Sequence, residues 1–216
     1  MRLTASVASP FLRKVNSNLT EPPVSESSKG LLRPAFWVFV LGLLAIDLAS
    51  KSWAFSEIGI HGHRPIMGEW LSFFCITNSG GIWGAGNNGG FTGILTIVRL
   101  IAVGVLILFV KRQADNNCLG LFTLALLIAG AVGNLYDNLS AWMPWDLEEP
   151  GKVRDFIMVD FNVPGWWPDW LGWPFHPFPI FNFADACISV GFVLLITGLA
   201  KLRLGAESED SAAASK

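Results

Sequence analysis

The chain has 216 residues, of which 52% are hydrophobic and only 15% are charged, and its formal net charge is −2. Soluble domains carry about 25% charged residues, so this composition favours a membrane protein, and the lack of a long basic run argues against nucleic-acid binding. The three cysteines form no CxxC motif, so neither a structural zinc site nor a disulfide framework is indicated.

Both ends of the chain are polar. Residues 1–33 are rich in serine, proline and charge and lack the apolar core of a secretory signal, and residues 204–216 have a similar polar character. We expect both ends to be disordered tails, which leaves residues 34–203 as one membrane domain.

Four apolar stretches approach the length of about 20 residues that a helix needs to cross a bilayer. They are about Pro34–Phe55, Phe91–Val110, Cys118–Leu139 and Phe181–Leu202. A short polar link, QADNN, joins the second to the third and predicts an antiparallel hairpin. The sequence therefore predicts an all-α membrane protein with four transmembrane helices.

Basic residues near the ends of these stretches predict the orientation, because lysine and arginine favour the cytoplasmic side. They are Lys29, Arg33, Lys111, Arg112, Lys201 and Arg203. Both termini are then expected to be cytoplasmic, and the connections 56–90 and 140–180 to face outward.

The two outer connections differ in character. The first contains RPIMGEWLSFFCITNSGG, in which proline, glycine and alternating apolar residues predict short strands, a glycine turn and a small extracytoplasmic β-sheet. The second is rich in tryptophan, which indicates an interfacial belt or, alternatively, a flap over a substrate. Its tryptophans are Trp142, Trp145, Trp166, Trp167, Trp170 and Trp173.

Polar residues collect at the predicted outer ends of the spans. Asp47 and Lys51 close the first, Asn134 and Asp137 close the third, and Asp185 opens the fourth. An ionisable residue within a span costs about 2.5–3.5 kcal/mol on insertion scales, so this clustering indicates a functional site.

Asp155 and Asp185 form a candidate carboxylate pair. Asp155 lies in KVRDFIMVDF, whose alternation predicts an extended segment. At a separation of about 4 Å and an effective dielectric of about 20, two carboxylates repel by roughly 4 kcal/mol. The pair would then share a proton, so that one member deprotonates water while the other polarises a peptide carbonyl.

The roles within this pair stay open at the level of sequence. The start of a helix favours charged Asp185 as the base, although coupled carboxylates titrate as a pair. Alternatively, Asp185 is only a helix cap and Asp155 a solvated loop residue.

Other chemistries have weaker support. HGH at 61–63 offers two metal ligands, but the third histidine, His176, lies in the other connection. No GxSxG elbow is present, and the glycine cluster lacks the lysine of a P-loop. We expect no metal and no cofactor.

Five motifs in order resemble those of lipoprotein signal peptidases, the signal peptidase II family. They are DLASK (47–51), TNSGGIWG (77–84), GAVGNLYDN (130–138), GKVRDFI (151–157) and FNFADACI (181–188). The resemblance implies an aspartic endopeptidase of the bacterial inner membrane, with membrane lipids around it. Its substrates would be prolipoproteins, cut on the amino side of a diacylglyceryl cysteine near the outer boundary.

The resemblance also implies residue roles. Asp155 and Asp185 would be catalytic, Asp137 with Asn134 would fix helix ends, and Asp47 with Lys51 would form an ion pair or contact substrate. The residues that would line or shape the site are Asn78, Gly80, Asn134, Asn182 and Ala184.

Two features depart from the family pattern. Asn138 stands where the family usually has arginine, and we expect Arg99 to supply the missing charge. The inserts AWMPWDLEEP and VPGWWPDWLGWPFHP are extra, and we expect them to fold as surface flaps.

Two other functions remain possible from the sequence: a small transporter whose charged residues line a polar path, or a scaffold whose Gly130 and Gly133 pack helices. The oligomeric state is not indicated.

Overall fold

The computed structural model describes residues 32–68, 70–80, 90–113, 117–143, 147–161 and 178–202. Residues 32 and 33 begin the first helix, whereas the rest of the two predicted tails lies outside the described residues. Most of the tryptophan-rich insert also lies outside them, so the belt and flap interpretations both stay predictions.

Four helices are described, and they follow the predicted apolar stretches. They are α1 (Leu32–Ile58), α2 (Gly90–Arg112), α3 (Cys118–Leu139) and α4 (Phe183–Ile196). Three of the described helices are long and apolar enough to cross a membrane, over Pro34–Ile58, Thr92–Arg112 and Cys118–Leu139. The mostly helical class is therefore confirmed, while α4, with 14 residues, is shorter than the predicted fourth stretch.

Local backbone signals explain why α4 is short. Asn182 is extended, with φ −126° and ψ 179°, and its side chain accepts a hydrogen bond from the Asp185 amide, so the helix begins after it. At the other end Thr197 is the C-cap, and Gly198 has φ +69°, a conformation that favours glycine. Hydropathy alone reports neither signal, which is why the sequence prediction ran past both ends.

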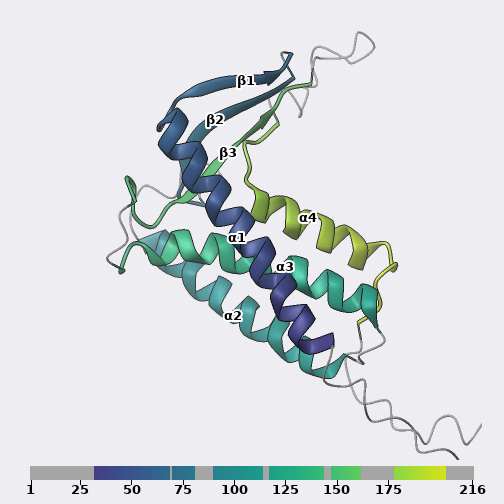
Figure 1. Ribbon diagram of the computed structural model, residues 1–216. Coiled ribbons are helices and arrows are strands. Elements are labelled where there is room, and N and C mark those ends of the chain that lie inside the picture. The colour runs from purple at the N-terminus through teal and green to yellow at the C-terminus, as the bar shows by residue number, and fades with distance from the viewer. Residues whose placement is uncertain are drawn as a thin grey trace, which may run out of the picture.

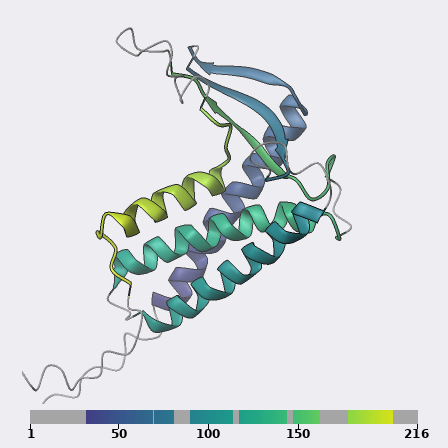
Figure 2. The same ribbon diagram turned by 180° about the vertical axis from the view of Figure 1, so that it is seen from behind.

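Helix α3 is the centre of the bundle. It packs against α1, α2 and α4, and in Figures 1 and 2 it lies between α2 and α4 while α1 crosses it. Of its most apolar window, 78% is buried inside the molecule, against 11% for α2. The outer faces of α1 and α2 therefore expose the large apolar side chains that a lipid environment tolerates.

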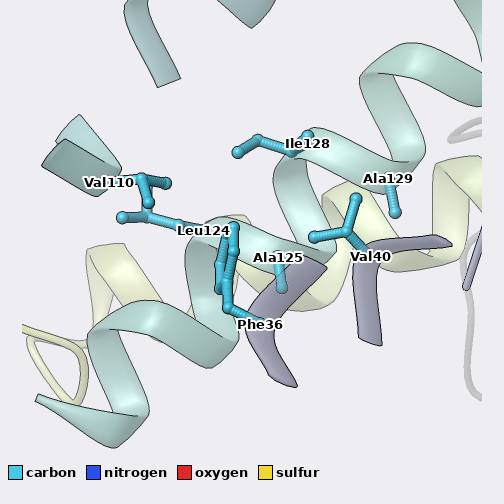
Figure 3. Packing of buried hydrophobic residues seen from close by; sticks show 7 residues of the cluster. All are labelled: Phe36, Val40, Val110, Leu124, Ala125, Ile128 and Ala129. Carbon is cyan, nitrogen blue, oxygen red and sulfur yellow. The ribbon is translucent and has the colours of Figure 1, made fainter. Parts of the chain in front are cut away.

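An apolar seam joins the three long helices away from the polar motifs. Figure 3 shows its side chains pointing toward one another: Phe36, Val40, Val110, Leu124, Ala125, Ile128 and Ala129. The alanines let α1 approach α3 closely, and close packing is what favours helix association in a membrane.

A three-stranded antiparallel sheet lies at one end of the bundle (Figure 1). Its order is β1 (His63–Met67), β2 (Leu71–Asn78) and β3 (Val153–Val159). The strands predicted in the first connection are present, and Gly80 after β2 has φ +76° as a glycine turn requires. The sheet packs on the end of α1 through Ala54, Cys75 and Phe156.

Strand β3 brings the second connection to the first. Asp155 pairs with Ile76 of β2, and Val153 pairs with Asn78. On its other side β3 bonds to the start of α4, where the amide of Ile157 donates to the carbonyl of Phe181 at 2.8 Å. The segment that opens α4 is thereby held beside Asp155.

Candidate active site

Asp155 is a buried strand residue. Only 2% of it is exposed, and its carboxylate accepts hydrogen bonds from the Nδ2 atoms of Asn78 at 3.2 Å and Asn182 at 2.6 Å. The extended segment predicted around Asp155 is present, and the alternative that it is a solvated loop residue is wrong.

Asp185 occupies the first turn of α4 and is part of a capping box. One carboxylate oxygen accepts from the backbone amide of Asn182 at 3.2 Å, while Asn182 in turn accepts from the amide of Asp185. The other oxygen accepts from Asn134 Nδ2 at 2.7 Å. Asn182 is therefore the N-cap and Asp185 the N3 member of the capping box, so Asp185 contributes to the capping of α4, and it also belongs to a side-chain network that reaches α3.

Asn182 connects the two aspartates. Its Nδ2 donates to Asp155 Oδ1 and, at 3.1 Å, to Asn134 Oδ1, while its own Oδ1 accepts from the amide of Asp185. It is fully buried. The carboxylates of Asp155 and Asp185, 30 residues apart in the chain, thus both bond to Asn182, the first to its side chain and the second to its backbone amide.

Burial and a neighbouring charge perturb Asp155. The pKa of Asp155 is raised from 3.8 to about 7, first by burial and second by the negative charge of Asp185. The hydrogen bonds from Asn78 and Asn182 act in the opposite direction. Asp185 lies in the first turn of α4.

A buried ion network lies behind the pair. Lys51, which is fully buried, contacts Asp47 at 2.8 Å and Asp137 at 3.1 Å, and its Nζ donates to Asn134 Oδ1 at 3.0 Å. This contact fixes the amide of Asn134 with its Nδ2 toward Asp185. Because Asp47 and Lys51 are inaccessible, the geometry supports the ion-pair interpretation of these residues over substrate contact.

Asp137 does more than end a helix. Its Oδ1 accepts from Arg154 Nε at 3.0 Å and Nη2 at 2.8 Å, and its Oδ2 accepts from the Arg154 backbone amide at 3.1 Å. Arg154 was missed from the sequence, although a cation next to Asp155 in a segment destined for burial was a signal that it needed a carboxylate partner.

Arg99 reaches the position where the family pattern is broken. Its Nη1 donates to Oδ1 of Asn138, and Asn138 Nδ2 donates to the carbonyl of Gly151 at 2.8 Å. The positive charge of Arg99 also interacts with Asp185, Asp155 and Asp137. Arg99 thus brings a positive charge from α2 close to the carboxylate pair, as required if it supplies the charge that is missing at Asn138.

Gly80 and Ala184 shape the surroundings of the pair by their small size. The Gly80 amide donates to Asn78 Oδ1 at 2.7 Å, and a Cβ at Gly80 would collide with Leu95. Ala184 is 1% exposed, and its amide donates to Asp47 Oδ1 at 2.9 Å, which holds α4 to α1. Every residue that the sequence placed at the site therefore lies in or directly beside one connected network.

The described end of the first insert also comes near the site. Thr77 Oγ1, next to Asn78 in β2, donates to Glu149, which pairs with Lys152 at 3.0 Å. The second insert lies outside the described residues.

The chain is similar to lipoprotein signal peptidases along most of its length. Residues 39–201 match the family model for signal peptidase (SPase) II. The lipoprotein signal peptidase of Staphylococcus haemolyticus is 32% identical over 165 residues, which cover 76% of this chain and 89% of that protein. For the enzyme of Pseudomonas fluorescens the identity is 29% over 174 residues, with 80% and 90% covered.

Two solved structures of bacterial membrane enzymes are similar in fold. A bacterial membrane enzyme solved at 1.9 Å resolution superposes with a TM-score of 0.60 at 25% identity, over 78% of this chain and 94% of that one. A second bacterial membrane enzyme structure gives a TM-score of 0.57 at 26% identity. With its apolar helices, the chain is a multi-pass membrane protein, and it belongs to the signal peptidase II family of lipoprotein-processing peptidases.

Proposed function

We propose that this peptidase is of the aspartic type, with Asp155 and Asp185 as its catalytic residues. The observation that carries the proposal is the buried asparagine, Asn182, whose side chain donates to the carboxylate of Asp155 and whose backbone amide donates to the carboxylate of Asp185. The pKa of about 7 for Asp155 supports it, because one proton is then available to the pair near neutral pH.

The proposed reaction is general acid and base hydrolysis without a covalent intermediate. Asp155, protonated, transfers its proton to the carbonyl oxygen of the scissile peptide, while ionised Asp185 takes a proton from water. The water oxygen then bonds to the carbonyl carbon. When the C–N bond breaks, the leaving amine takes the proton held by Asp185, and the carbonyl re-forms as the proton returns to Asp155.

The substrate follows from the family. The proposed substrates are prolipoproteins whose cysteine already carries diacylglycerol, cut on the amino side of that cysteine. The carboxylate pair lies where α4 begins and the sheet meets the bundle, at the end away from the apolar seam (Figure 1). A lipid-bearing peptide reaching this level from the bilayer would bring its scissile bond to the boundary with water.

We further propose a single domain over 34–203 with four spans, both termini cytoplasmic and the site at the outer face of the inner membrane. Asn134 meets Asp185 at one end of the α3 and α4 pair, and Asn117 Nδ2 donates to the carbonyl of Lys201 at the other. The stretch of α3 between these contacts is about 25 Å long at 1.5 Å per residue. The segment from α4 to Lys201 covers the same depth, which supports a fourth crossing.

The transporter alternative is less favoured. Asp47 and Asp137 would have to line a polar path, but both are at most 1% exposed and both are paired with buried cations. Their charges stabilise the fold of the site and offer no surface to a passing ion.

Substrate and product test the function. We would incubate the purified protein with a prolipoprotein carrying diacylglyceryl cysteine, and with the same prolipoprotein left unlipidated, and identify products by mass spectrometry. The expected result is a mature fragment beginning with the lipidated cysteine, from the lipidated substrate only. Equal cleavage of both substrates, or cleavage at another bond, would contradict the assigned specificity.

A further inference from the structure

We propose that Arg154 is a positioning residue that, through Asp137, sets where Asp155 stands relative to Asp185. The proposal rests on the function proposed above for the two aspartates. It assigns to Arg154 a role in the reaction although the guanidinium itself binds Asp137 and not the reacting atoms.

The contact between Arg154 and Asp137 constrains the backbone as well as the side chain. Asp137 accepts three hydrogen bonds from this one residue, two from the guanidinium fork and one from the backbone amide directly before Asp155. The Nε and Nη2 atoms both donate to Oδ1 of Asp137, and the backbone amide donates to Oδ2, so this one residue engages both oxygens of the carboxylate. Strand β3 is therefore anchored to α3 one residue before the catalytic carboxylate.

The ladder between β2 and β3 is regular on one side of Asp155 and irregular on the other. Asp155, Arg154 and Val153 pair with Ile76, Thr77 and Asn78, whereas the register shifts between Ile76 and Phe73. At a β-bulge the pairing is locally disrupted, and the bulged strand bends. The bond to Asp137 adds a constraint from α3 to the side of Asp155 that the sheet already pairs.

Helix α3 connects this anchor to the other aspartate. Asn134 and Asp137 are three residues apart, so they lie on the same face of α3. Asn134 donates to Asp185, and Asp137 holds Arg154. One rigid helix thus holds both members of the pair from adjacent turns, and the position of Asp155 relative to Asp185 depends on the Arg154 bond.

The surroundings of Arg154 make the idea testable without unfolding the protein. Asp137 also pairs with Lys51, so removing Arg154 does not leave that carboxylate without a cation. Arg154 lines a partly polar cavity of about 190 Å³ with Ser52, Phe55, Ser56, Leu147 and Glu148. Its Nη1 is 3.5 Å from Oγ of Ser52, which also lines this cavity. If the side chain of Arg154 is truncated, a small cation that enters the cavity can occupy the position of the guanidinium group.

The first test compares kinetics of three variants with the wild type on the lipidated prolipoprotein. Arg154→Gln and Arg154→Ala are expected to lower kcat on the order of 10- to 100-fold with KM within about twofold, because small misplacements of catalytic groups have effects of that size. Lys152→Gln is the matched control, since Lys152 is a neighbouring cation whose partner is the partly exposed Glu149. It should leave kcat unchanged.

Chemical rescue separates positioning from stability. Guanidinium chloride at millimolar concentration should restore part of the kcat of Arg154→Ala, whereas urea, its neutral analogue, should not. Wild-type kcat in Arg154→Ala, or a loss of activity matched by loss of folded protein and unaffected by guanidinium, would overturn the proposal.

A structural readout keeps the two proposals apart. If the wild type cleaves the prolipoprotein, the kinetics above decide the role of Arg154. If it does not, the proposed function fails, and hydrogen exchange at the amides of Asp155 and Phe156 still tests the anchor. Faster exchange in Arg154→Ala than in Lys152→Gln would support the anchor, and equal exchange would overturn it.

Discussion

Asp155 and Asp185 have similar chemistry but different environments. Asp155 is buried in a strand, where burial first and the charge of Asp185 second raise its pKa to about 7. Asp185 lies in the first turn of α4, and its carboxylate accepts two hydrogen bonds. In the reaction proposed above, the raised pKa of Asp155 makes it the member that carries the shared proton, which leaves Asp185 as the proposed base.

The raised pKa of Asp155 predicts a specific pH dependence of stability. Between pH 3.8 and about 7 the unfolded chain has released this proton while the folded protein keeps it, so the free energy of unfolding falls as pH rises. Below this window both states hold the proton, and above it both have lost it. The full effect is about 4 kcal/mol at the 1.36 kcal/mol that each pKa unit represents.

Replacing Asp155 with asparagine removes this pH-dependent contribution to the free energy of unfolding. The Tm of Asp155→Asn minus the Tm of the wild type, both measured in detergent, is expected to rise as the pH increases from 3.8 to about 7 and to stay constant at higher pH. A difference that stays constant across the window would show that Asp155 does not keep its proton in the folded state.

The contact between Arg99 and Asn138 predicts that Asn138→Arg restores the activity that is lost in Arg99→Gln. Arg99→Gln removes a charge-assisted hydrogen bond, worth about 1.5–3 kcal/mol, and should lower kcat/KM about 10- to 100-fold. Adding Asn138→Arg to that variant returns a cation to the same place and should recover activity. Lys111→Gln, which removes an exposed cation at the end of α2, is the control. Failure of Asn138→Arg to rescue would rule out charge compensation.

At the scale of helices and strands, close packing between α3 and its neighbours depends on glycine. A Cβ at Gly133 would collide with the Asp47 carboxylate and lie 3.3 Å from the Ala184 Cβ. Gly133→Ala is therefore expected to destabilise the protein by about 1–3 kcal/mol, as overpacking does. Gly104→Ala in α2 meets nothing within 4 Å and should leave stability unchanged or higher.

Unfolding midpoints in detergent measure both glycine variants. Equal midpoints for Gly133→Ala and Gly104→Ala would mean that α1, α3 and α4 are not packed as described.

The helices were largely predictable because each leaves a local signal. Cys118–Leu139 was predicted with the observed bounds, and the strands of the first connection followed from alternation and glycine. The ends of α4 were not predicted, because Asn182 and Gly198 act through capping and backbone conformation and not through hydropathy.

Long-range contacts left weaker traces in the sequence. The motifs indicated which polar residues belong to the site, but not that Asn182 bonds to Asp155 or that Asp137 bonds to Arg154. Such contacts depend on the register in which β3 pairs with β2 and on the angle at which α4 packs against α3. Neither the register nor the packing angle is a property of a local segment.

For the whole molecule, the proposed orientation can be tested with cysteines. Of the three native thiols, Cys118 at the start of α3 is exposed, whereas Cys75 and Cys187 are buried. A membrane-impermeant maleimide applied to spheroplasts should label Glu57→Cys in a Cys118→Ser background, because Glu57 is exposed at the sheet end of α1. Cys118 of the wild type should be labelled only after lysis. The reverse pattern would invert the topology and place the carboxylate pair inside.

The central claim is that two aspartates held by one asparagine perform the hydrolysis, and single-site amide variants test it most directly. On a diacylglyceryl prolipoprotein, Asp155→Asn and Asp185→Asn should each lower kcat by about 100- to 10,000-fold, the range for loss of a general acid or base. Asp160→Asn, which changes another carboxylate just after β3, should keep wild-type kcat. Cleavage at the wild-type rate by either Asp155→Asn or Asp185→Asn, in folded protein, would contradict the account.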